Sequence, residues 1–209
     1  MRVWFWGIKV LTLSLFLGTL LPLGASAAEK IGVLLLHGKA GGNKSIYHLS
    51  GKLVSAGFLV EMPSSTPWSP NRIYDRTYLE TLKEMDAAVD KLKAAGATRV
   101  VVGGHSIGAN VALGYAANRK GLAGLIVLGA GHFISGNFMG KKLGKHVARA
   151  KKMIAAGKGN EEADFDDINQ RKLKSRGMTA EIYQSWFDPE GPANMRNNAA
   201  SLPGDLPVL

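Results

Sequence analysis

The sequence feature that most constrains the fold is a regular alternation of buried strands and amphipathic helices over residues 31–128. The run IGVLLL at its start is continuously apolar, as expected of a strand that is buried on both faces. Neighbouring parallel strands need long crossover connections, which the intervening helices provide. The sequence therefore predicts an α/β fold, in which helices cover both faces of a parallel sheet. The predicted strands are 31–36, 58–62, 99–102 and 122–128, and the predicted helices are 45–55, 79–92 and one that begins at 107.

The N-terminal residues 1–27 have the organisation of a secretory signal peptide. Arg2 and Lys9 are basic, the following residues are mostly apolar, and small residues precede Ala28. The apolar run is shorter than the roughly 20 residues that span a bilayer, and an uncleaved anchor is the alternative. We predict cleavage near Ala27, a secreted or periplasmic location and one mature domain at 28–209. The chain has no cysteine, so it forms no disulfide and carries no lipid-modified cysteine.

The character of the sequence changes after Gly131. Residues 132–200 are charged and helix-prone, and their pattern predicts no strand. The basic stretch 141–158 has apolar residues at helical spacing, and an acidic cluster follows it at 161–167. We predict that 132–200 forms a helical cap inserted into the domain, and that 205–209 begins one more strand.

A G-x-S-x-G motif lies directly between a predicted strand and a predicted helix, at Gly104 to Gly108. In this setting the motif is typical of a nucleophile elbow, a sharp turn that exposes a serine at the carboxyl end of a strand. Glycines are needed two residues before and after the serine, because a Cβ there would collide with the neighbouring strand or helix. Ser106 is therefore the predicted nucleophile.

The His37-Gly38-Lys39 turn follows the first predicted strand. A turn at this place can present a backbone N–H to the oxygen that becomes negative during acyl transfer. We predict that the N–H groups of Lys39 and Ile107 form such an oxyanion hole. His37 is expected to brace the turn.

Together these elements resemble the α/β-hydrolase superfamily, from the first strand and its HG turn to the GHSIG motif and the helix after it. The resemblance is clear over 31–131 and weaker from Tyr183 onward. It implies a hydrolase of esters or related acyl bonds, with an acidic residue after the next strand and a catalytic histidine after the last. Neither maps onto this sequence, which reaches Leu209 with those C-terminal strands missing. On this reading we expect this chain to have little activity.

The histidines within the chain offer one substitute for the missing base. His132 follows a predicted strand at its carboxyl end, where it could lie near the serine. No carboxylate follows closely enough to orient it, and the superfamily places the base elsewhere. His105 is expected to pack beside the elbow, because neighbouring side chains there point in different directions.

Composition narrows the choice of partners. The formal net charge of +10 favours contact with anionic surfaces, whereas the sequence shows no platform of interleaved basic and aromatic residues for nucleic acid. No motif predicts a metal or another cofactor. The expected partner is a small-molecule acyl substrate, and the oligomeric state does not follow from the sequence. Two alternatives remain open: a non-catalytic binding protein that keeps the fold, and an interaction module whose basic stretch 141–158 binds anionic surfaces.

Overall fold

A computed structural model describes residues 29–134 and 138–209. The predicted signal peptide, 1–27, lies outside these residues. The described chain contains a four-stranded parallel sheet in the order β2-β1-β3-β4, which confirms the predicted α/β fold. The strands are β1 (Ile31–Leu36), β2 (Leu59–Glu61), β3 (Arg99–His105) and β4 (Gly124–Leu128).

Helices cover both faces of this sheet, as the alternation predicts. Val33 and Leu35 of β1 point to one face and pack with Ile46 in a small apolar cluster beside α1. Leu34 and Leu36 point to the opposite face and join the main core with α2 and α3. This two-sided burial explains why the strand is apolar at almost every position. The covering segments are η1 (Asn43–Ile46), α1 (Tyr47–Ser55), α2 (Tyr78–Ala94) and α3 (Ile107–Asn118).

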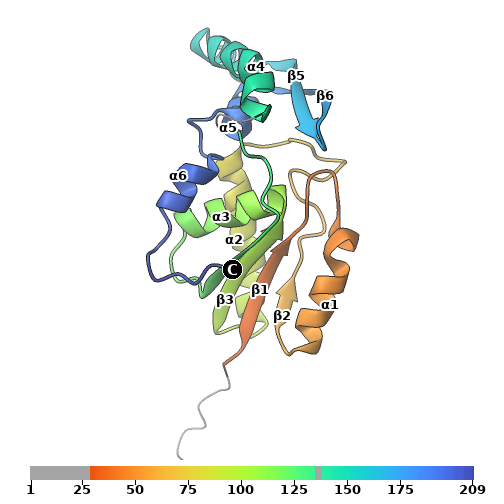
Figure 1. Ribbon diagram of the computed structural model, residues 1–209, viewed down its shortest axis with the longest axis vertical. Helices are drawn as coiled ribbons and strands as arrows, with labels where there is room; N and C mark the ends of the chain where they lie inside the picture. The colour runs from red at the N-terminus through yellow and green to blue at the C-terminus, as the bar shows by residue number, and fades with distance from the viewer. Residues whose placement is uncertain (1–28, 135–137) are drawn as a thin grey trace, which may run out of the picture.

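The cap differs from the prediction, because the expectation of no strand in 132–200 is wrong. An antiparallel hairpin of two eight-residue strands follows the basic helix α4. The cap lies beyond the carboxyl ends of the parallel strands, at the top of Figure 1. It consists of α4 (Phe138–Ala155), β5 (Glu162–Asn169), β6 (Lys172–Thr179) and α5 (Ala180–Phe187), and α6 (Met195–Ala200) follows it.

The sequence pattern does not predict this hairpin, for two physical reasons. Its turn places Gln170 and Arg171 at φ 49° and 66°, a conformation that usually selects Asn-Gly or Asp-Gly. In β5 the buried positions include the charged residue Asp167, which disguises the apolar and polar alternation of a half-buried strand. An acidic cluster in the sequence is therefore a strand in the structure.

The cap has its own aromatic centre. Phe165 of β5 stacks on Tyr183 of α5, and Tyr183 stacks on Phe187, with 4.4 Å between ring centroids in both pairs. His146 of α4 contacts Asp166 at 2.9 Å, and the guanidinium of Arg149 lies 5.3 Å from the Phe165 ring. The basic helix is thus held on the hairpin by a hydrogen bond as well as by packing on the aromatic ring of Phe165.

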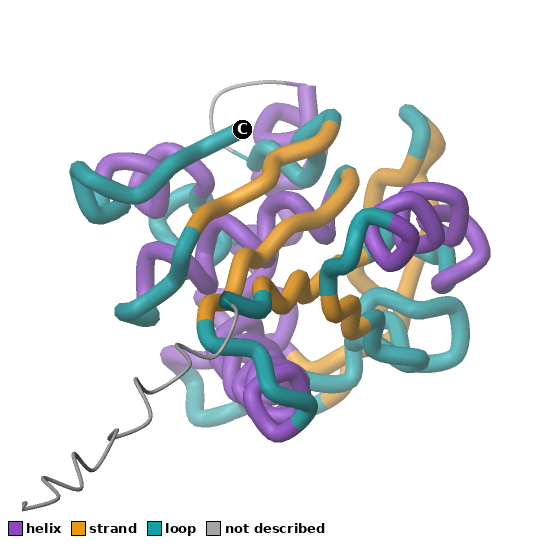
Figure 2. The backbone as a smooth tube through the Cα atoms, turned by 90° about the horizontal axis from the view of Figure 1, so that it is seen from below, coloured by secondary structure: helices purple, strands orange, loops and turns teal. Residues whose placement is uncertain are grey.

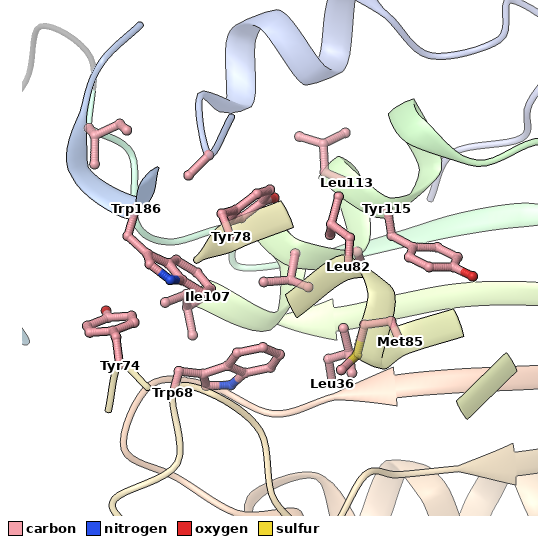
Figure 3. Close-up of a cluster of buried hydrophobic side chains, with 14 of the residues drawn as sticks. Leu36, Trp68, Tyr74, Tyr78, Leu82, Met85, Ile107, Leu113, Tyr115 and Trp186 are labelled. Carbon is pink, nitrogen blue, oxygen red and sulfur yellow. The ribbon is translucent and has the colours of Figure 1, made fainter. Parts of the chain in front are cut away.

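Trp186 of α5 is one of the residues through which the cap packs on the core (Figure 3). Its ring is fully buried and lies 5.0 Å from Tyr78 and 6.4 Å from Trp68 between centroids. Its Nε1–H donates to the carbonyl of Arg76 at 2.9 Å. A buried indole whose N–H is satisfied supplies both apolar area and orientation.

The last residues run beside β4, as Figure 2 shows near the C-terminus. Val208 pairs with Leu125 in parallel, and the N–H of Leu125 donates to the carbonyl of Pro207 at 2.9 Å. This pairing confirms the predicted strand-like character of 205–209. Within the described ranges, no helix is long and apolar enough to span a membrane.

Candidate active site

Ser106 occupies the turn between β3 and α3 in a conformation that is uncommon for a residue with a side chain. Its φ and ψ are 58° and −120°. The turn is held from both sides, because the Ser106 N–H donates to the carbonyl of Leu128 and the Ser106 carbonyl accepts from the N–H of Gly131, each at 3.0 Å. Such strain persists only where the surroundings enforce it, and it is characteristic of functional turns.

The glycines of the motif are required by backbone contacts. A Cβ on Gly104 would lie 2.4 Å from the carbonyl of Gly108, and a Cβ on Gly108 would lie 2.5 Å from the carbonyl oxygen of Leu36. The predicted steric need for both glycines is confirmed. Gly131 is a third glycine of this kind, since its Cβ would lie 2.7 Å from Ser106 Oγ. Sequence reasoning missed it because it comes from the loop after β4.

The loop after β1 passes directly beside the serine. A Cβ on Gly38 would lie 3.4 Å from Ser106 Cβ and 3.1 Å from His105 Nδ1. In the described part of the chain, the N–H groups of Lys39 and Ile107 find no hydrogen-bond acceptor, and Ser106 Oγ has no hydrogen-bond partner. Ile107 is the first residue of α3, where an N–H lacks an acceptor within its own helix. The elbow thus combines the hydroxyl of a half-buried serine with backbone donors that are unpaired in the described chain.

His37 braces this loop, as expected. Its Nδ1–H donates to the carbonyl of Gly38 at 2.8 Å, and its Nε2 accepts from the Thr66 hydroxyl at 3.1 Å. Trp68 Nε1–H donates to the His37 carbonyl at 2.8 Å. Burial lowers the pKa of His37, which favours the neutral ring that these hydrogen bonds require. The segment after β2 therefore fixes the HG turn from behind.

His132 lies in an aromatic pocket and forms no hydrogen bond with Ser106. Its Nε2–H donates to the carbonyl of Trp186 at 2.7 Å, so its Nδ1 is the unprotonated nitrogen. That atom is buried without a partner among the described residues. Burial, and then the positive charge of Lys39, lowers the pKa of His132 to about 3. Its role as general base stays a prediction, which this low basicity disfavours.

His105 is exposed at the end of β3, on the other side of the elbow. Its ring approaches the backbone of Gly38 on one side and of Gly129 on the other. Its expected packing role stays a prediction.

The sequence and the fold of this chain are similar to those of known proteins. A family model described as "Alpha/beta hydrolase family" matches residues 33–207. The chain belongs to the alpha/beta hydrolase family. This match covers both the elbow and the cap, and it confirms the resemblance found in the sequence.

Solved structures agree on the fold. A monoacylglycerol lipase from Paleococcus ferrophilus superposes with a TM-score of 0.57 at 18% identity, over 85% of this chain and 82% of that one. A putative hydrolase from Agrobacterium vitis S4 gives 0.54 at 15% identity, over 86% and 78%. A metagenome-derived lipolytic enzyme gives 0.50 at 17% identity, over 83% and 66%. This chain spans between 55% and 66% of the length of three such structures. Among curated proteins no relative was found.

A buried amide behind the elbow connects three parts of this chain. The Tyr78 hydroxyl donates to Asn110 at 2.9 Å, and Asn110 Nδ2 donates to the carbonyls of Ala193 and His132 at 3.0 and 3.4 Å. Asn110 is fully buried in α3, one turn after Ser106. No sequence motif marks this residue, because its partners come from segments far apart in the chain.

An apolar pocket of about 360 Å³ lies within the cap, between α4 and the segment after α5. Lys151 and Asp188, paired at 2.8 Å, stand at its wall. Ser106 does not line it, whereas Phe187 lines it and also packs on His132, with ring centroids 4.8 Å apart. The pocket and the elbow are therefore separated by the aromatic residues that enclose His132.

Acidic and histidine side chains do not converge into a metal site. No group of three or more His, Cys, Asp or Glu residues in 29–134 and 138–209 has the arrangement of a metal centre.

Proposed function

We propose that this chain is a serine hydrolase for esters or related acyl bonds of small molecules, in which Ser106 is the nucleophile. The observation that carries the proposal is the strained φ of Ser106 beside N–H groups of Lys39 and Ile107 that lack partners in the described chain. In this role Ser106 Oγ attacks the acyl carbon, and the two N–H groups stabilise the oxygen that becomes negative. The N-terminus of α3 adds a favourable dipole.

The lipolytic names of the structural neighbours support acyl esters as the substrate class. They share only the fold with this chain at such identities, so the substrate remains part of the proposal. Because no described side chain takes the proton of Ser106 through a hydrogen bond, we expect slow turnover by the 209-residue chain.

Labelling with a fluorophosphonate tests the nucleophile. The folded protein should react at Ser106, identified by peptide mass spectrometry, at least tenfold faster than the same protein unfolded in urea. Ser106→Ala should abolish the labelling. Ser201→Ala is the matched control, because Ser201 is exposed at the end of α6, and it should label as the wild type does.

Equal labelling of folded and unfolded protein would refute the proposal and favour the non-catalytic binding protein. Rapid turnover of a p-nitrophenyl ester would instead contradict the expected slow turnover. In that case His132→Gln decides whether His132 is the base, because only a base role predicts that this variant loses turnover while it stays folded.

A second proposal concerns the exposed side of α4. We propose weak contact with anionic surfaces there, since Lys141, Lys142, Lys145 and Lys152 are all exposed on this helix. Sedimentation with vesicles that contain anionic lipid tests it. Neutralising Lys145, Arg149 and Lys152 should abolish binding. Neutralising the three exposed lysines Lys83, Lys91 and Lys93 on α2 is the control of equal charge, and it should leave binding unchanged. No difference between the two variants would reject this surface.

We also propose export through residues 1–27. N-terminal sequencing of the protein expressed with its full sequence in a bacterial host should give Ala28 as the first residue in the extracytoplasmic fraction. A protein that keeps Met1 in the cytoplasm would contradict this proposal.

A further inference from the structure

The side chain of Lys39 is buried away from solvent and bound to the cap. Its Nζ donates to Asp167 Oδ1 at 2.6 Å and to the carbonyl of Ile168 at 3.1 Å. The two charged side chains are 5% and 2% exposed. The ammonium also lies 5.5 Å and 5.6 Å from the ring centroids of Tyr74 and Phe187. An ion pair between residues 128 positions apart therefore links the loop after β1 to the hairpin.

Asp167 is oriented for this contact. Its cross-strand neighbour in the hairpin is Lys174, yet its carboxylate pairs with Lys39. The same Oδ1 accepts the N–H of Ile168 at 2.7 Å, which fixes the carboxylate against its own strand. Burial lowers the pKa of Lys39, and the charge of Asp167 opposes this effect. Since burying two charges is costly, a buried ion pair is weak evidence for added stability and can instead specify one arrangement of the chain.

The backbone N–H groups around Lys39 show which part of the turn its side chain can orient. On the core side, the next N–H groups are anchored: Ala40 donates to the carbonyl of Trp68 at 2.9 Å, and Gly41 donates to the carbonyl of Gly38 at 3.1 Å. The Lys39 N–H has no acceptor in the described chain. Its peptide also follows Gly38, which lies against Ser106. The orientation of this N–H thus depends on the turn and on the side chain that ties Lys39 to the cap.

We propose that Asp167 is a positioning residue, which acts through the Lys39 side chain to hold the Lys39 N–H toward Ser106. The cap hairpin then completes the oxyanion hole, and its docking is coupled to the reactivity of the serine. This inference rests on the proposed function of Ser106. Oxyanion donors must approach to about 2.7–3.1 Å, and a misplacement of about 1 Å can cost about 100-fold in rate.

The experiment measures two properties of the full chain in wild type, Asp167→Asn and the double variant Lys39→Met/Asp167→Leu. The first property is fluorophosphonate labelling of Ser106, resolved into the inactivation constant kinact and the binding constant KI. The second is amide hydrogen exchange of residues 37–41, compared with exchange in β3. The double variant removes both charges with apolar side chains of similar size, so it should stay folded.

We expect kinact to fall at least tenfold in both variants while KI stays within twofold of wild type. Exchange at 37–41 should rise about tenfold, whereas exchange in β3 stays unchanged. Glu161→Gln is the matched control, because it breaks an exposed ion pair of the same cap, Lys158–Glu161 at 3.3 Å, and it should alter neither property.

The outcomes separate this inference from the proposed function. Wild-type kinact together with unchanged exchange at 37–41 would overturn the positioning role. A merely structural role would raise exchange in β3 as well and leave kinact of the folded protein unchanged, which also overturns it. Absent labelling in the wild type would refute the proposed function and the oxyanion role with it. The exchange measurement would then decide by itself whether Asp167 positions the loop.

Discussion

In the elbow, the contacts that fix Ser106 are backbone contacts of one strand, one turn and one helix with the adjacent strands. In the cap, the contacts that fix its position join side chains far apart in the sequence, such as Lys39 with Asp167 and Trp186 with Arg76. The elbow tolerates no atom beyond hydrogen at Gly104 and Gly108. The position of the cap depends on contacts between aromatic and charged side chains, and such side chains can pair in many different arrangements. Local steric contacts therefore fix the conformation of Ser106, whereas contacts between distant segments fix the position of the cap.

This comparison suggests how the two regions respond to change. A disturbance of the elbow has no room to relax, because backbone atoms occupy the space around it. A disturbance of the cap can be absorbed by movement of side chains, unless it leaves a buried polar group unpaired. Four substitutions test this difference, from the largest expected effect to the smallest.

Gly104→Ala should have the largest effect. Its new Cβ would lie 2.4 Å from backbone atoms of Gly108, so the elbow must distort. We expect a loss of about 3 kcal/mol or more in the free energy of unfolding, measured by urea denaturation. Gly51→Ala is the control, because nothing lies within 4 Å of its Cβ on α1, and it should gain about 0.5–1 kcal/mol. Equal effects of the two variants would contradict the steric account of the elbow.

The junction between the elbow and the cap should weaken in acid because of His132. Its pKa is about 3 in the folded protein and about 6.5 when unfolded, so between these values only the unfolded chain binds the proton. Stability is fully present above pH 6.5 and should fall by about 1.4 kcal/mol per unit as the pH drops. Urea denaturation between pH 6.5 and 4.5 should therefore show a loss of about 2 kcal/mol, because half of the unfolded-state histidine is already protonated at pH 6.5.

His132→Gln should remove most of that slope. A smaller slope remains from His37, whose pKa is also lowered. An unchanged dependence of stability on pH in the variant would show that His132 is not buried as a neutral ring.

Tyr78→Phe removes a buried hydroxyl of α2 that holds Asn110, the residue whose Nδ2 bonds the segment before α6. Asn110 Oδ1 would lose its donor, since the Tyr78 hydroxyl contacts it at 2.9 Å. We expect a loss of about 1–2 kcal/mol in urea denaturation. Tyr47→Phe is the control, because Tyr47 is 67% exposed, and it should leave stability unchanged. A loss as small as that of the control would mean that the Asn110 amide finds another donor. The contact would then relax by side-chain movement, as we expect for contacts of the cap.

Thr77→Ala should have the smallest effect of the four. Thr77 forms a capping box with Glu80 at the start of α2, beside the place where the N–H of Tyr78 donates to Ser185 of the cap. Loss of the N-cap hydroxyl of α2 should lower the free energy of unfolding by about 1 kcal/mol, measured by thermal or urea denaturation. Thr77→Ser should restore most of it, because serine keeps the hydroxyl. Failure of this rescue would show that packing of the Thr77 methyl group, rather than capping, stabilises this end of α2.

The elbow could be predicted from the sequence much more fully than the cap. The run 31–36 and the elbow at Ser106 could be predicted, because apolar runs and glycine spacing report contacts within a short segment. The hairpin could not, because its turn uses Gln170 and Arg171 and its inner face contains Asp167. The candidate oxyanion donor Lys39 was predicted through its backbone, whereas the partner of its side chain was not.

The sequence by itself determined the parallel sheet, the strand–turn–helix unit around Ser106 and the glycines that permit it. These features depend on backbone sterics and on the period of apolar residues, which a short stretch of sequence encodes. Only the tertiary structure decided that Lys39 pairs with Asp167, that Asn110 joins three segments and that His132 turns its Nε2–H to Trp186. A buried polar group must find its partner wherever the fold brings one, and that partner is set by three-dimensional proximity rather than by spacing along the chain.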